Sequence, residues 1–137
     1  MIVLDTHVLV WAVNDERRLG AEARAAIAAA GETDEIGISA ITPWEIALLA
    51  ESGRLRLAQE AGAWIRAALA LPGIRLLPID PAIATDSARL PGALRADPAD
   101  RLLVATARQC GAPLLTADFA ILSYAAGGHV QTIDATR

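Results

Sequence analysis

The chain opens with Met1-Ile-Val-Leu-Asp-Thr-His-Val-Leu-Val-Trp11, and this stretch decides the fold class. Its first part, Ile2-Val3-Leu4, is an unbroken apolar run rich in β-branched residues and ends on an acid, Asp5. An apolar run without polar alternation is typical of a strand buried on both faces, as in a parallel sheet covered by helices. Residues 8–13 then suit a short buried helix. The opening therefore predicts an α/β domain.

The same succession of short apolar strands and helices continues to the end of the chain. Further strands are predicted at residues 36–39, 74–79, 113–116 and 130–133. Further helices are predicted at residues 20–30, 42–51, 58–71, 81–90 and 98–110. No linker, repeat or low-complexity segment interrupts this alternation. The sequence thus predicts a single domain over residues 1–137, with a mainly parallel central sheet covered on both faces.

Composition excludes several classes of protein. Of the 137 residues, 54% are hydrophobic and 20% are charged, which is too apolar for a disordered chain. No apolar run is long enough to span a bilayer. The first residues have no basic segment, which argues against a signal peptide. A lone cysteine, Cys110, excludes a disulfide framework and a cysteine-based zinc site, and we expect a cytoplasmic protein.

The basic residues exclude much enzyme chemistry. All 12 are arginine, so mechanisms that need a lysine, such as P-loop phosphate binding or Schiff-base formation, are absent. The same absence counts against a metal-dependent phosphatase. The net charge of −4 argues against simple electrostatic binding of nucleic acid. It is compatible with an enzyme whose acidic site is neutralised by bound metal.

Acidic residues recur where strands end and helices begin. Asp5 and Asp118 follow predicted strands, and Glu45 and Asp100 lie in the first turns of predicted helices. Ligands of open parallel sheets bind at this edge. Carboxylates crowded there would repel one another, and a hard divalent cation, Mg²⁺ or Mn²⁺, would relieve the repulsion.

Helix capping is the alternative interpretation of each acid taken singly. Thr42-Pro-Trp-Glu45 has the spacing of a capping box, with Thr42 as N-cap and Glu45 at N3. Asp97-Pro-Ala-Asp100 has the same design with an aspartate N-cap. Asp5 can cap the helix that follows it, and Asp118 can be an ordinary turn residue. Capping does not readily explain four acids at one edge in a chain without lysine.

The sequence resembles the PIN-domain ribonucleases, and within them the VapC-type toxins of toxin–antitoxin pairs. The resemblance covers essentially the whole chain. It is carried by five stretches in order: Ile2-Val-Leu-Asp-Thr-His-Val-Leu-Val-Trp11, Ser39-Ala-Ile-Thr-Pro-Trp-Glu-Ile-Ala47, Gly53-Arg-Leu-Arg-Leu57, Asp97-Pro-Ala-Asp-Arg-Leu-Leu-Val-Ala-Thr-Ala107 and Leu115-Thr-Ala-Asp118.

This resemblance implies a three-layer α/β/α sandwich and Mg²⁺- or Mn²⁺-dependent endonucleolytic cleavage of RNA. It also implies inhibition by a cognate VapB-like antitoxin and a homodimeric assembly. By matching position, the metal-binding and catalytic acids are Asp5, Glu45, Asp100 and Asp118. Further candidates for contact with substrate or with these acids are Thr6, Thr116, Asp97 and Arg101.

The chain offers no Ser/His/Asp set, so the resemblance and the residues together indicate attack by water. His7 is expected to be structural or to support the site, and the tryptophans to lie in the core or an interface. Apolar side chains between Pro43 and Leu57 are expected to form a groove for an amphipathic antitoxin helix, unless the helix at 58–71 covers them. The alternatives are a PIN nuclease of RNA processing without an antitoxin, and a catalytically silent PIN interaction module.

Overall fold

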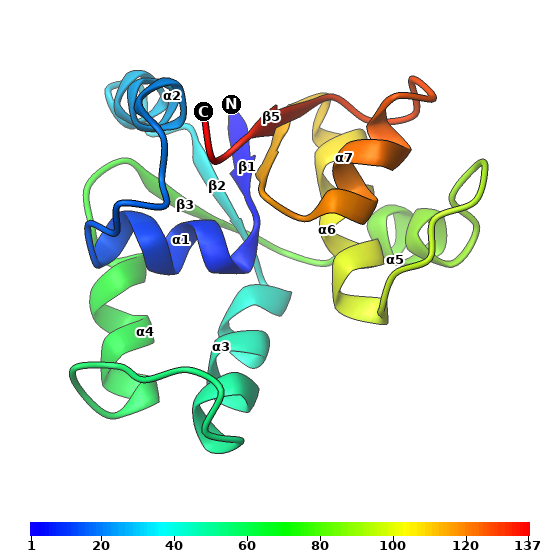
Figure 1. The fold of residues 1–137 in the computed structure, drawn as a ribbon. Helices are drawn as coiled ribbons and strands as arrows, with labels where there is room; N and C mark the ends of the chain where they lie inside the picture. The colour runs from blue at the N-terminus through cyan, green and yellow to red at the C-terminus, as the bar shows by residue number, and fades with distance from the viewer.

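The computed structural model describes residues 1–137, and its centre is a five-stranded sheet. The strands are β1 (Ile2–Leu4), β2 (Ile36–Ser39), β3 (Ile74–Leu77), β4 (Leu114–Thr116) and β5 (Thr132–Asp134). They lie in the order β3-β2-β1-β4-β5, and every neighbouring pair is parallel. β1 is therefore the central strand (Figure 1). The prediction of a parallel α/β sheet is confirmed.

Helices cover both faces of this sheet. They are α1 (Thr6–Val13), α2 (Ala21–Gly31), α3 (Ile41–Glu51), α4 (Ala61–Leu69), α5 (Pro81–Ala88), α6 (Pro98–Cys110) and α7 (Phe119–Ala125). Side chains of α1 to α4 pack with Ile2 and Leu4 in one apolar core, and those of α5 to α7 pack with Val3 in the other. The alternating side chains of β1 thus serve two cores, which explains why its sequence is apolar throughout. The result is the expected three-layer α/β/α arrangement.

The order in which the chain adds strands to the sheet changes side between β1 and β4. From β1 the chain proceeds outward to β2 and β3, and it then returns to add β4 and β5 on the other side. Such a switch point is where open parallel sheets bind ligands at the carboxyl ends of their strands. Leu4 pairs with Leu115 in the register, so Asp5 and Thr116 follow side by side at this edge. Both are buried.

The helix boundaries follow local capping, and α6 begins and ends as predicted. Its N-cap is Asp97, whose Oδ1 accepts the backbone N–H of Asp100 at 2.9 Å, with Pro98 at the first helical position. Gly111 ends α6 with φ +61°, a left-handed conformation that glycine adopts without steric strain.

Other predicted boundaries need correction. The helix predicted at 58–71 spans only Ala61–Leu69, because the Glu60 carboxylate accepts the N–H groups of Gly62 and Ala63 and starts the helix there. The helix predicted at 81–90 ends at Ala88, and the strand predicted at 74–79 ends at Leu77. α7 was not expected from the sequence.

The helices of the structure include none with the length and apolar character needed to span a membrane.

Candidate active site

Asp5 lies at the carboxyl end of β1 and is only 3% exposed. The hydroxyl of Thr116 donates to its Oδ2 at 2.6 Å, and the backbone N–H of Thr6 donates to its Oδ1 at 2.7 Å. Burial raises the pKa of Asp5, and the nearby His7 and the Thr116 hydrogen bond oppose that rise. Each oxygen of this carboxylate is thereby held by a donor from a different element, and the side chain has a fixed orientation.

His7 links the start of α1 to the turn after β4. Its Nε2 accepts the backbone N–H of Ala117 at 3.2 Å, so the proton of a neutral ring is assigned to Nδ1. Nδ1 lies 3.6 Å from Oδ2 of Asp5, and the ring packs against Trp11. These contacts favour the interpretation that His7 supports the site.

Glu45 is held by a hydroxyl from another helix. The hydroxyl of Thr6 donates to Oε1 of Glu45 at 2.6 Å and lies 3.1 Å from the hydroxyl of Thr42. Burial raises the pKa of Glu45, and the charges of Asp5 and Asp97 add to the effect. Glu45 therefore lies in the same electrostatic environment as Asp5.

The predicted capping box at Thr42 and Glu45 is wrong. α3 begins at Ile41, before Thr42, and its N-cap Ala40 has no capping side chain. The hydroxyl of Ser39 accepts the N–H of Ile41 at 3.1 Å, so the helix starts earlier than the spacing indicated. Thr42 and Glu45 are then both free to bond Thr6. The sequence signal for this role was the threonine three residues before the glutamate, which puts both on one helix face.

Asp100 lies in the first turn of α6 and is half-buried. Burial, together with the charges of Asp5, Asp97, Glu45 and Asp118, raises the pKa of Asp100 to about 7. The pKa of Asp100 therefore responds to the charges of all the other acids. The structure thus brings the sequence-predicted acids into one electrostatic cluster at the switch point.

Asp118 is the N-cap of α7. Its Oδ1 accepts the N–H of Ile121 at 3.1 Å, and its own N–H donates to the Thr116 hydroxyl at 3.0 Å. Thr116 accordingly connects Asp118 to Asp5 through one hydroxyl group. Thr6 and Thr116 each donate a hydrogen bond to one of the acids, and Asp97 is a helix cap whose charge affects Asp100.

The donor set of this cluster is made of carboxylate oxygens, with threonine hydroxyls behind them. Oxygen ligands of this kind suit Mg²⁺ and Mn²⁺, and mutual repulsion among the acids favours a bound cation. As placed, no three His, Cys, Asp or Glu side chains come close enough to enclose one ion together. The chemistry of the residues fits a hard divalent cation, and its coordination stays a prediction.

Arg101 follows Asp100 in sequence, but its guanidinium makes its hydrogen bonds to backbone carbonyl groups and not to the acids. Its guanidinium donates to the carbonyl oxygens of Ser87 at 2.8 Å and Leu94 at 3.2 Å, and so holds α5 and the following loop against α6. These bonds give Arg101 a structural role, and its contact with substrate stays a prediction. The tertiary fold decides this role, because it brings two carbonyl groups from other parts of the chain to Nε and one terminal nitrogen of Arg101.

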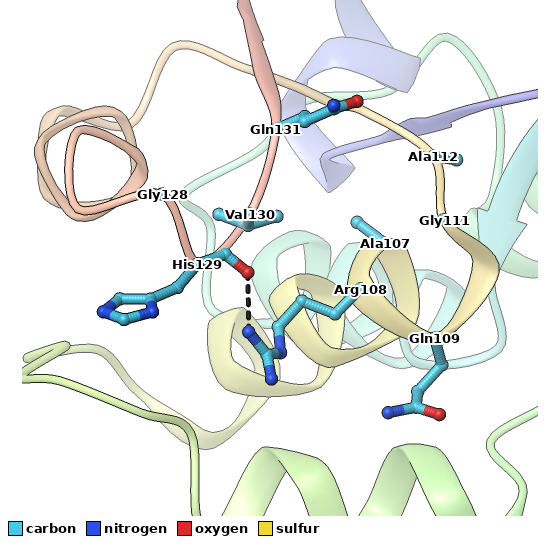
Figure 2. A pocket seen from close by; sticks show the side chains of 9 residues that line it. All are labelled: Ala107, Arg108, Gln109, Gly111, Ala112, Gly128, His129, Val130 and Gln131. Carbon is cyan, nitrogen blue, oxygen red and sulfur yellow. Dashed lines mark hydrogen bonds between the residues drawn. The ribbon is translucent and has the colours of Figure 1, made fainter.

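A separate pocket lies away from the acidic cluster, between the end of α6 and the start of β5 (Figure 2). Arg108 donates there to the carbonyl oxygen of His129 at 2.6 Å and pairs with Asp86, whose Oδ2 lies 2.9 Å from Nε. Its cation is fully engaged by these partners. The nine residues that line this pocket include no acid.

Comparison with known proteins identifies the family. A family model described as PIN domain matches residues 2–127. The chain belongs to the PIN-domain family. It is 36% identical to ribonuclease VapC22 of Mycobacterium tuberculosis over 123 residues, which cover 90% of this chain and 91% of that protein. The resemblance to VapC-type members is therefore confirmed.

Solved structures with a similar fold agree with this assignment. A toxin–antitoxin complex from Klebsiella pneumoniae contains a chain with a TM-score of 0.59 and 22% identity, over 86% of this chain and 87% of that one. VapBC2 from Rickettsia felis, bound to a DNA fragment from its promoter, contains a chain with a TM-score of 0.69 and 15% identity. The match covers 97% of this chain and 98% of that one. At these identities the similarity establishes the fold.

Proposed function

We propose that this chain is a Mg²⁺- or Mn²⁺-dependent endoribonuclease and the toxin of a toxin–antitoxin pair. The observation that carries the proposal is the convergence of Asp5, Glu45, Asp100 and Asp118 at the switch point of a PIN fold. The named relative, 36% identical over nearly the whole chain, is a ribonuclease.

We assign different roles to the threonines and the acids of the site. Thr6 and Thr116 hold Glu45 and Asp5 by hydroxyl donors, so these carboxylates enter the reaction already oriented. Asp100 and Asp118 are the acids we assign to orienting the attacking water and accepting its proton at a carboxylate oxygen. A bound divalent cation would lower the pKa of that water and stabilise the negative charge that develops on the scissile phosphate.

The proposed partner is a VapB-like antitoxin that binds beside Glu45. Trp44 and Leu48 on α3 are 56% and 52% exposed, four residues apart and therefore on one side of the helix. Ile46 is buried, and Leu55 and Leu57 pack against the core, so the exposed apolar surface is narrower than the sequence suggested. An antitoxin helix on Trp44 and Leu48 would carry a basic side chain within reach of the acids. A second copy of the chain completes the proposed assembly.

The test combines cleavage with substitution of the acids. Purified chain is incubated with a structured RNA in Mg²⁺, in Mn²⁺ and in EDTA, and the products are resolved by length. We expect internal cleavage that needs the cation and is lost in Asp5→Asn, while circular dichroism shows that the variant is folded. A folded chain that binds neither cation and leaves RNA intact would instead indicate a silent interaction module.

The antitoxin is tested in the same assay. The product of a small reading frame beside the gene is titrated into the cleavage reaction at several Mg²⁺ concentrations. Inhibition that weakens as Mg²⁺ rises supports direct competition at the acids. Absence of any such product that binds would favour a nuclease of RNA processing.

A further inference from the structure

We propose that Thr42 is a positioning residue for Glu45, acting through the hydroxyl of Thr6. The inference rests on the proposed function, because it concerns how Glu45 is prepared to bind a divalent cation. The carrying observation is a line of three oxygen atoms across two helices. Thr42 Oγ1 lies 3.1 Å from Thr6 Oγ1, which donates to Oε1 of Glu45 at 2.6 Å.

The donors in this line can be assigned because each hydroxyl has a single proton. An ionised carboxylate only accepts, so the proton of Thr6 is directed to Glu45. The oxygen of Thr6 can then only accept from Thr42. The direction is therefore Thr42 to Thr6 to Glu45, and Thr42 determines where the proton of Thr6 points.

Burial removes the alternatives open to Thr42. The side chain is 0% exposed, so its hydroxyl cannot turn to solvent. A threonine within a helix commonly donates to the carbonyl four residues earlier, and Thr106 does so toward Leu102 at 2.7 Å. Thr42 is the second residue of α3, so the residue four earlier, Ile38, belongs to β2, and the hydrogen-bond partner of Thr42 is the hydroxyl of Thr6. Its donor is thus directed out of α3 and toward α1.

The consequence for Glu45 is that one oxygen is fixed and the other stays available. Oε1 receives the Thr6 hydroxyl, whereas Oε2 takes no hydrogen bond from the protein. A carboxylate anchored in this way presents a defined free oxygen to a cation. Groups that orient a metal-binding side chain typically change affinity by about tenfold to a hundredfold when they are removed.

The experiment measures Mn²⁺ binding to the full chain by electron paramagnetic resonance of the free ion. Thr42→Val removes the hydroxyl at nearly constant volume, and we expect Mn²⁺ affinity to fall by about tenfold. Thr42→Ser keeps the hydroxyl and should restore wild-type affinity. Thr106→Val is the matched control, because it removes another buried helix hydroxyl that is not bonded to the site, and its affinity should be unchanged.

A double-mutant comparison tests whether Thr42 acts on Mn²⁺ affinity through Thr6. Thr6→Val breaks the line at its second member, so Thr6→Val with Thr42→Val should bind Mn²⁺ no more weakly than Thr6→Val alone. Should Thr42→Val not fold, Thr42→Ala removes the same hydroxyl and carries the same expectation.

Equal affinity of wild type and Thr42→Val overturns the inference while leaving the proposed function intact. Loss of affinity in Thr42→Ser as well also overturns it, because packing rather than the hydroxyl would then be responsible. A wild-type chain that binds no Mn²⁺ overturns the proposed function together with this inference.

Discussion

Replacing Asp100 by asparagine is expected to stabilise the metal-free protein at pH 8. Burial and the neighbouring acids raise the pKa of Asp100 from its ordinary value of 3.8 to about 7. A carboxyl whose pKa is higher in the folded state binds more protons folded than unfolded between those two values. The free energy of unfolding must therefore fall as the pH rises from about 4 to about 7, and it is level above that range.

The size of the stability change is worked out from the pKa shift of Asp100 and then reduced for screening by solvent. At about 1.4 kcal/mol per pH unit, a shift of this size corresponds to about 4 kcal/mol in a fully shielded site. Because Asp100 is only half-buried, screening reduces this to about 1–2 kcal/mol. An acid in the first turn gains only a few tenths of a kcal/mol from the helix dipole. Repulsion within the cluster is the larger effect, so loss of the charge should stabilise the fold.

The assay is urea unfolding at about pH 3.5 and at pH 8 in EDTA, with wild type and Asp100→Asn compared at each pH. We expect the two proteins to be alike near pH 3.5, below both pKa values, and the variant to be more stable by about 1–2 kcal/mol at pH 8. Asp80→Asn is the control, because Asp80 caps α5 by accepting the N–H of Ile83 at 2.8 Å and its replacement keeps a good N-cap. The reasoning would be refuted if Asp100→Asn were less stable than wild type at pH 8. It would also be refuted if the free energy of unfolding had the same pH dependence in both proteins.

Three further outcomes are expected. Mg²⁺ or Mn²⁺ at about one hundred times its Kd should raise the free energy of unfolding by about 2.7 kcal/mol in thermal melts, and Asp100→Asn should lose most of that gain. Asp118→Asn should keep its melting temperature, because asparagine also caps a helix, yet lose about a hundredfold or more in RNA cleavage; equal cleavage would make Asp118 a cap alone. Trp44→Ala should weaken antitoxin binding by about 2 kcal/mol or more in calorimetry without changing Mn²⁺ affinity, and unchanged antitoxin binding would remove α3 from the interface.

Local signals in the sequence determined much of this protein. The unbroken apolar run Ile2-Val3-Leu4 specified a central strand with a core on each face, because a strand buried on both sides has no polar position. The N-cap Asp97 and the stop at Gly111 specified the limits of α6, since both act on backbone groups within a few residues. α7 also had its signal in Asp118 as N-cap before apolar residues, and it was missed because the segment is short.

Only the tertiary structure decided what the polar side chains of the site do. Thr42-Pro-Trp-Glu45 has the spacing of a capping box, but Thr42 and Glu45 bond Thr6, 36 and 39 residues away in sequence. Arg101 was close to the acids in sequence and is bound instead by carbonyl groups of α5 and the loop after it. The physical reason is that helix and strand signals depend on neighbouring backbone, whereas a side-chain donor binds whichever acceptor the packing of distant elements brings to it.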